Sequence, residues 1–198
     1  MTLPNKLTVA RLIMAPLFFI VFCLRRWIGP EATVASSVIC IILYTAIELT
    51  DLLDGKIARK YHLVSDLGKV MDPFGDTLSH LTFFLCFLME GIMPEYCFAV
   101  IMYREFAILF IRLLMVSQGH VMPANMWGKS KTCTYAAGSI LGILYLLFAA
   151  VMPSASWLSG WLAFTKFVFV LAALASVVSF LNYIRLIVKN GSLSKMTR

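Results

Sequence analysis

The chain has few charged residues, and it has no aspartate outside one short segment. Only 14% of its 198 residues are charged, whereas 61% are hydrophobic and the mean hydropathy is +0.87. This composition excludes an ordinary soluble domain. Apolar runs recur at intervals that suit helices of about 20 residues, the length needed to cross a bilayer. We therefore predict an all-α membrane protein made of a single domain, residues 1–198.

The patterns of a disulfide framework or a zinc site are also missing. The five cysteines contain no C-x-x-C pair and lie in or just inside apolar runs, so we expect small buried side chains. The opening residues MTLPNKLTVARL lack the basic start and the small-residue cleavage site of a signal peptide, and the first span is expected to be retained.

Six transmembrane helices are expected, at about 8–27, 32–53, 70–90, 96–116, 132–152 and 160–188. Lysine and arginine gather in the connections on one side of these spans, so the positive-inside rule places both termini in the cytoplasm. The net charge of +7 agrees with attraction to anionic headgroups, and no soluble basic module is present to bind nucleic acid. Gly138 and Gly142 form a G-x-x-x-G pattern in the fifth span that permits close helix contact.

All five aspartates lie between residues 51 and 76, on the cytoplasmic side between the second and third spans. Asp51 and Asp54 are three residues apart and Asp72 and Asp76 four apart, so each pair shares a helix face. If these helices are antiparallel neighbours, four carboxylates converge, and protons or cations must neutralise them. Hard oxygen ligands suit Mg²⁺, Mn²⁺ or Ca²⁺, and two ions would resemble the sites that clamp phosphate displacements. Asp66 is off this spacing and fits an ordinary loop acid.

Small residues and one arginine separate the two pairs: Gly55, Ala58, Arg59, Ser65 and Gly68. Small residues let a ligand approach the backbone, and an arginine offers a planar fork to a phosphate. The combination suggests a bound, metal-chelated diphosphate. Solvated loop charges are the alternative, but these acids adjoin apolar segments, where ionisable groups are costly and normally functional.

The spacing D-x-x-D-G-x-x-A-R-x₈-G-x₃-D-x₃-D runs without a gap from Asp51 to Asp76, and it resembles the signature of the CDP-alcohol phosphatidyltransferase family. With six expected helices, the resemblance covers nearly the whole chain. It implies transfer of a phosphatidyl group from CDP-diacylglycerol to an alcohol with release of CMP, typically by a homodimer. It further implies that Asp51, Asp54 and Asp72 hold divalent metals, Mg²⁺ or Mn²⁺, and that Asp76 is both a further ligand and the general base. The residues implied to line the cytidine diphosphate site are Gly55, Ala58, Arg59, Ser65 and Gly68.

Four basic residues, two within the fourth span and two at the cytoplasmic opening of the fifth, bear on the identity of the alcohol: Arg104, Arg112, Lys129 and Lys131. Membrane anchoring would explain the lysines, and pairing with Glu105 or Glu48 would explain Arg104. Intramembrane arginines also suggest a cavity for an anion, because an unpaired buried charge costs several kcal/mol. An anionic acceptor favours glycerol 3-phosphate or inositol phosphate over serine or choline.

These basic residues and the opening LPNKLTVAR most resemble the phosphatidylglycerophosphate synthase branch of the family. In that branch Asn5, Thr8 and Arg11 would lie near the nucleotide or diphosphate, whereas a helix entry with a snorkelling Arg11 explains them equally well. His80, one turn beyond Asp76, fits either a hydrogen bond to a metal ligand or a packed core residue.

Other functions are compatible with parts of this pattern. Gly75 and Thr77 stand where the branch often carries alanine and lysine, so inositol phosphate, inositol, serine and choline stay open as acceptors. A divalent-cation transporter is the alternative from another class, but it would usually place its acids near the bilayer midplane.

Overall fold

A computed structural model describes residues 2–61, 66–117 and 126–189, and the described residues form helices without any strand. The elements are α1 (Leu3–Trp27), a short 3-10 helix η1 (Pro30–Ala32), α2 (Thr33–Lys60), α3 (Asp66–Met89), α4 (Glu95–Ser117), α5 (Met126–Val151) and α6 (Leu158–Lys189). Each of the expected apolar segments coincides with one α-helix.

Four helices extend several residues beyond the expected apolar segments. α1, α3 and α5 begin earlier than expected and α2 ends later, and each extension includes polar or charged residues. Hydropathy marks the apolar stretch, but backbone hydrogen bonds continue the helix through polar residues. The aspartate pairs therefore lie on helices rather than in a loop.

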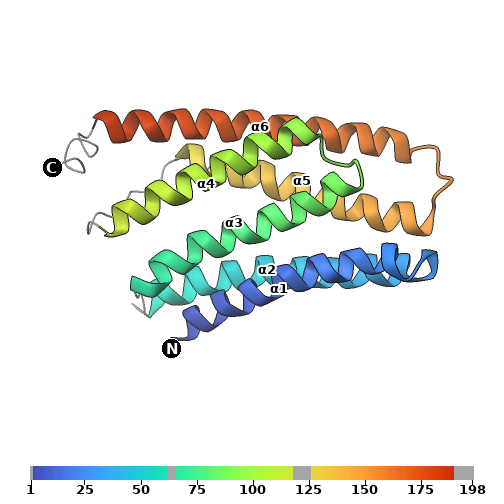
Figure 1. Ribbon diagram of the computed structural model, residues 1–198, viewed down its shortest axis with the longest axis horizontal. Coiled ribbons are helices and arrows are strands. Elements are labelled where there is room, and N and C mark those ends of the chain that lie inside the picture. Colours follow the sequence, from blue (N-terminus) through green and yellow to red (C-terminus); the bar gives the residue numbers. More distant parts are fainter. Residues whose placement is uncertain (1, 62–65, 118–125, 190–198) are drawn as a thin grey trace.

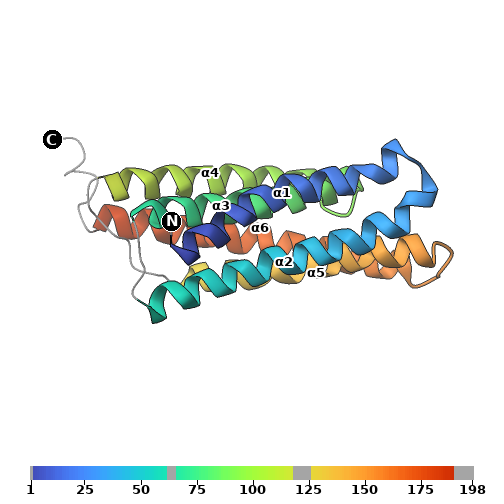
Figure 2. The same ribbon diagram turned by 90° about the horizontal axis from the view of Figure 1, so that it is seen from below.

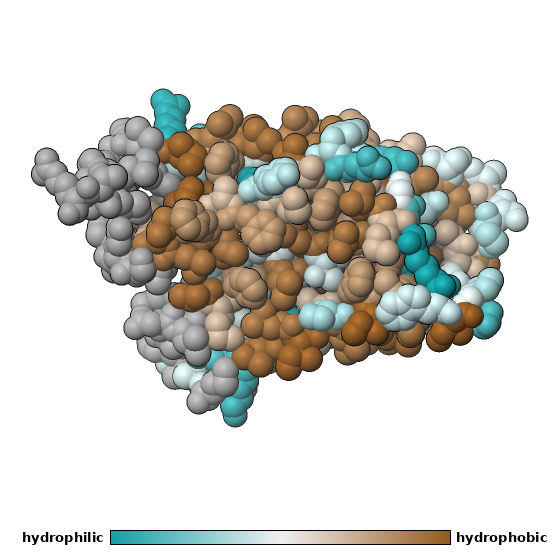
Figure 3. All heavy atoms as spheres, in the orientation of Figure 1, coloured by the Kyte–Doolittle hydropathy of each residue, from teal (hydrophilic) through white to brown (hydrophobic). Residues whose placement is uncertain are grey.

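Among the described residues, four segments are long and apolar enough to cross a membrane: Leu3–Trp27, Pro30–Ala58, Ser130–Val151 and Leu158–Leu186. The other two long helices, α3 and α4, do not meet this criterion. They carry the charged residues Asp72, Asp76, Arg104 and Glu105. Figure 3 shows largely hydrophobic side chains over the middle of one face of the molecule, with hydrophilic ones mostly toward its two ends. The chain is a helical membrane protein.

The helices lie lengthwise beside one another in a bundle (Figures 1 and 2). α1 packs against α2 and α3, α5 packs against α6 and α2, and α4 packs against α6 and α3. The starts of α1, α3 and α5 and the ends of α2, α4 and α6 lie at the same end of the bundle. The parts of α2 and α3 that carry the aspartate pairs are thus at this end.

An aromatic core holds the helices together. Phe18 of α1 meets Phe83 of α3 edge to face with ring centroids 4.8 Å apart, and Phe84 of α3 meets Phe169 of α6 in the same way at 5.6 Å. All four rings are completely buried. Edge-to-face pairs add a geometric preference to area burial, which fixes how these helices face one another.

Both glycines of the G-x-x-x-G pattern serve close packing, as expected. A Cβ atom on Gly138 would lie 2.9 Å from Phe169 Cε1, and one on Gly142 would lie 3.1 Å from Phe87 Cε1. The backbone of α5 therefore approaches the aromatic core closely at these two glycines.

The cysteines are all free, and four of them are buried. Cys133 is exposed, so the expectation of burial was wrong for this residue. It lies near the start of α5, and the apolar run that follows it does not dictate which helix face is covered.

Gly138→Ala should destabilise the bundle by about 1–3 kcal/mol, because the buried Phe169 ring must move to admit the methyl group. Thermal unfolding of the detergent-solubilised protein measures the change. Gly160→Ala is the control, since nothing lies within 4 Å of its Cβ position and alanine favours a helix. Equal unfolding temperatures for the two variants would contradict the close-packing role of Gly138.

Candidate functional site

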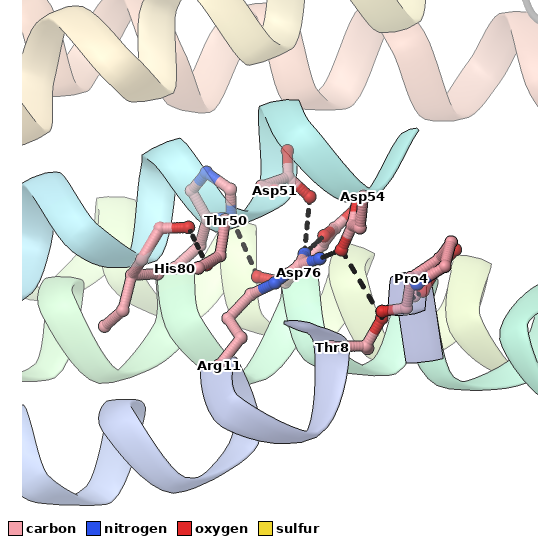
Figure 4. A network of polar contacts seen from close by, with 10 residues as sticks. Pro4, Thr8, Arg11, Thr50, Asp51, Asp54, Asp76 and His80 are labelled. Atoms are coloured by element: carbon pink, nitrogen blue, oxygen red, sulfur yellow. Dashed lines mark hydrogen bonds and ion pairs between the residues drawn. The ribbon is translucent and has the colours of Figure 1, made fainter. Parts of the chain in front are cut away.

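The four aspartates of the signature lie on two helices that α1 brings together. Asp51 and Asp54 are in the C-terminal part of α2, and Asp72 and Asp76 are in the N-terminal part of α3. α1 packs against both helices, and its side chains lie between the two acidic pairs (Figure 4). The expected convergence of the carboxylates is found, and it is mediated by a third helix.

Arg11 of α1 is the centre of this acidic cluster. Its Nη1 atom donates to Asp51 Oδ1 and Asp76 Oδ1, and its Nη2 atom donates to Asp54 Oδ2 (Figure 4). The side chain is only 1% exposed. The alternative of a snorkelling Arg11 is therefore wrong, because the guanidinium turns inward to the aspartates and not outward to the membrane surface.

Thr8 holds the remaining aspartate of the signature. Its hydroxyl lies 2.7 Å from Asp72 Oδ1, to which it donates, and 3.4 Å from Asp54 Oδ2. Thr8 is fully buried, and Asn5, one turn earlier on α1, is buried as well. The spacing of residues 5, 8 and 11 places them on one helix face, which is the face that meets the acids.

The acidic cluster carries more negative than positive charge. One guanidinium contacts three of the four carboxylates, and a hydroxyl contacts the fourth. Asp54 is 5% exposed, whereas the Asp51 and Asp76 side chains are 45% and 46% exposed, so the cluster opens on one side. Carboxylates collected at low dielectric without matching positive charge favour the binding of cations.

Within the described ranges, the His, Cys, Asp and Glu side chains form no group of three or more that is placed to hold a metal ion. Three of the carboxylates contact Arg11, and that of Asp72 contacts Thr8. Their chemistry nevertheless suits a hard divalent cation, which takes carboxylate oxygens. The donor set fits such an ion on chemical grounds.

The residues expected to line the nucleotide site are described in part. Gly55 and Ala58 lie half-buried in the last turns of α2, and Gly68 is buried near the start of α3. The side chain of Arg59 and all of Ser65 lie outside the described residues.

A second polar cluster lies on α4, α5 and α6. Glu105 Oε1 accepts from Arg104 Nη1 at 3.0 Å, from Lys131 Nζ at 2.8 Å and from the Tyr135 hydroxyl at 2.9 Å. Arg104 Nη2 also donates to Ser179 Oγ at 3.0 Å. One buried carboxylate therefore ties two cations together across neighbouring helices.

This Glu105 cluster has an excess of positive charge. Two cations face one carboxylate, and Arg104 Nε is buried without a hydrogen-bond partner among the described residues. The expected pairing of Arg104 with Glu105 is confirmed, and Lys131 joins the same pair. Arg112 lies two turns further along α4 with an exposed side chain, and the side chain of Lys129 is outside the described residues.

Two aromatic residues connect the acidic cluster to the Glu105 cluster. His80 Nδ1 lies 2.8 Å from the backbone oxygen of Asp76, to which it donates in the tautomer with a proton on Nδ1. The His80 ring centroid is 5.7 Å from that of Tyr135, whose hydroxyl binds Glu105. His80 thus contacts the backbone of Asp76 and packs against Tyr135, which fits the packed residue considered for it.

The sequence patterns missed two members of the Glu105 cluster. Tyr135 follows Lys131 by four residues and so shares its helix face, a spacing that could have revealed it. Ser179 carried no such signal, because its partner lies on α4. Glu105 was expected only as a counter-ion for Arg104, whereas it organises the whole cluster.

Comparison with known proteins shows which family this chain resembles. The family model described as CDP-alcohol phosphatidyltransferase matches residues 1–181. A Treponema pallidum protein named CDP-diacylglycerol–glycerol-3-phosphate 3-phosphatidyltransferase is 34% identical over 93% of this chain and 88% of its own length. A Bacillus subtilis protein of the same name is 36% identical over 66% of this chain and 70% of its own. A Streptomyces coelicolor cardiolipin synthase (CMP-forming) is 29% identical over 85% of this chain and 72% of its own.

Glu105→Gln should lower the free energy of unfolding by about 3–5 kcal/mol, because it leaves Arg104 and Lys131 buried without their counter-charge. Thermal unfolding in detergent tests this. Glu90→Gln is the control: its pair with Arg26 is partly exposed, and such pairs contribute about 0–1 kcal/mol. A Glu105 variant as stable as the Glu90 variant would show that Glu105 is not the anchor of the cluster.

Proposed function

The chain belongs to the CDP-alcohol phosphatidyltransferase family, and we propose that it transfers the phosphatidyl group of CDP-diacylglycerol to glycerol 3-phosphate, releasing CMP and forming phosphatidylglycerol phosphate. The observation that carries the proposal is that an acidic cluster and a buried cationic cluster lie near each other, with His80 contacting both the backbone of Asp76 and the ring of Tyr135. The acidic cluster suits a metal-chelated diphosphate, and the cationic cluster suits the phosphate of an anionic acceptor.

Divalent-metal dependence is part of the proposal. Two ions, Mg²⁺ or Mn²⁺, would be held by Asp51, Asp54, Asp72 and Asp76, whose oxygens match the preference of these ions. When bound, the ions would neutralise charge on the diphosphate and on departing CMP.

The chain's own residues position and deprotonate the acceptor. Asp76 is the proposed general base, since about half of its side chain is accessible and it adjoins the connection to the Glu105 cluster. It takes the proton of the acceptor hydroxyl as that oxygen attacks the β-phosphorus, and the bond from this phosphorus to the CMP oxygen breaks. The small residues Gly55, Ala58 and Gly68 leave room for the nucleotide, and Asn5, Arg59 and Ser65 are proposed to contact it as well.

The acceptor phosphate is proposed to bind at Arg104 and Lys131. These two positive charges face the single negative charge of Glu105. Arg104 Nε is also a buried donor without a hydrogen-bond partner among the described residues. A phosphate would supply the missing acceptor and negative charge. Lys129 and Arg112 are proposed to contribute to the same positive field from the cytoplasmic ends of α5 and α4.

A phospholipid acceptor is the second candidate, because one relative is named a CMP-forming cardiolipin synthase. In that chemistry phosphatidylglycerol would take the place of glycerol 3-phosphate. Cation transport is less well supported, since the aspartates lie at the end of the bundle and not at its middle.

The proposed setting is the cell membrane, with six spans, both termini in the cytoplasm and the active site facing the cytoplasm. The bundle supports this topology, because the start of α1, the end of α6 and the acidic cluster lie at the same end as Lys6, Lys56 and Lys60. A homodimer is proposed from the family resemblance.

The decisive experiment is CMP release by the purified protein from CDP-diacylglycerol and Mg²⁺. Glycerol 3-phosphate, phosphatidylglycerol, inositol phosphate, inositol and serine are supplied in parallel, with and without a chelator. Release should require glycerol 3-phosphate and stop when the metal is removed. Release with another acceptor alone would reject the proposed acceptor, and release in the chelator would reject the metal.

Asp76→Asn should lower kcat by about 10²–10⁴-fold, because an amide cannot accept the hydroxyl proton. Binding of CDP, measured by calorimetry, should largely survive. Asp66→Asn is the matched control, since this aspartate is off the signature spacing and should keep its activity. Normal turnover by the Asp76 variant would exclude it as the base.

A further inference from the structure

Arg11 occupies one oxygen of each of three carboxylates that would hold a divalent cation. Its two terminal nitrogens contact Asp51 Oδ1, Asp76 Oδ1 and Asp54 Oδ2. A guanidinium and a metal ion therefore compete for the same three carboxylates. Like charges at low dielectric also repel strongly, so a cation bound among these aspartates would weaken the hold on Arg11.

We propose that Arg11 is an exchangeable counter-cation. It neutralises the aspartates, a divalent cation displaces it from them, and its freed N–H donors then bind the anionic diphosphate. The identity of the diphosphate rests on the proposed function, whereas the exchange with a cation rests only on the contacts of Arg11.

Two features suit Arg11 to such an exchange. Its Nε atom is buried without a hydrogen-bond partner among the described residues, so it has a donor to spare even while it binds the acids. The planar fork of a guanidinium matches a phosphate as well as a carboxylate, which lets one side chain serve both partners.

The contacts around Arg11 allow the exchange to change only a few of the polar contacts at the site. Asp72 is held by Thr8 and not by Arg11, so one ligand stays in place while the other three change partners. Pro16 of α1 lies just beyond Arg11, and a proline within a helix removes one backbone hydrogen bond.

The test compares Mn²⁺ binding to the full-length protein in detergent without any substrate, using electron paramagnetic resonance of the free ion. Arg11→Met should bind Mn²⁺ at least about tenfold more tightly than the unsubstituted protein, because its competitor is gone. Arg11→Lys, which keeps the charge, should fall between the two. Arg26→Met is the matched control, because Arg26 lies at the other end of α1 and pairs with Glu90.

A second measurement, of CDP affinity, should change in the opposite direction to the Mn²⁺ affinity. At saturating Mn²⁺, Arg11→Met should bind CDP at least about tenfold more weakly, since the displaced guanidinium no longer contacts the diphosphate. A merely structural role would weaken both ligands together. Opposite shifts from one substitution therefore identify the exchange.

Three results would overturn the proposal: Mn²⁺ binding to Arg11→Met that is no tighter, CDP binding that is unchanged, or a variant that stays unfolded at every Mn²⁺ concentration. The last result would show that a cation cannot replace Arg11. A variant that folds only with Mn²⁺ supports the exchange. Neither measurement uses an acceptor, so a wrong acceptor assignment would leave these results standing, and failure here would leave the transfer reaction untouched.

Discussion

The structure depends on the neutralisation of carboxylates gathered at one end of an apolar bundle. Four aspartates on two helices repel one another, and charge repulsion in apolar surroundings must be offset by a counter-charge. α1 supplies it by burying Arg11 against three of them and by hydrogen-bonding the fourth through Thr8. This arrangement holds the ends of α2 and α3 in register, and it still leaves the cluster with excess negative charge.

A second charge imbalance, an excess of positive charge, lies in the Glu105 cluster of the same bundle. Glu105 gathers Arg104 and Lys131 but cannot match both. His80 and Tyr135 stand between the two clusters. Charges left unmatched at low dielectric are costly, and binding partners of the opposite sign recover that cost. A cation-loaded diphosphate and a phosphorylated acceptor are such partners, and the arrangement would bring them side by side.

Much of the fold could be read from hydropathy, because a helix in a membrane must be apolar over about 20 residues. The spacing of the aspartates likewise placed each pair on a helix face. The helix ends were less predictable, since α2 and α3 continue through polar residues that hydropathy treats as a loop. The exposure of Cys133 was also missed, because burial depends on which neighbour covers a helix face.

The sequence by itself determined the class of protein, the signature of its family and the residues that could share a helix face. These follow from composition and from spacings of three or four residues, which one helix converts directly into proximity. The tertiary structure alone decided that Arg11 meets Asp51, Asp54 and Asp76, and that Glu105 meets Lys131 and Tyr135. Such contacts join separate helices, and the packing of the aromatic core sets which faces of those helices come together.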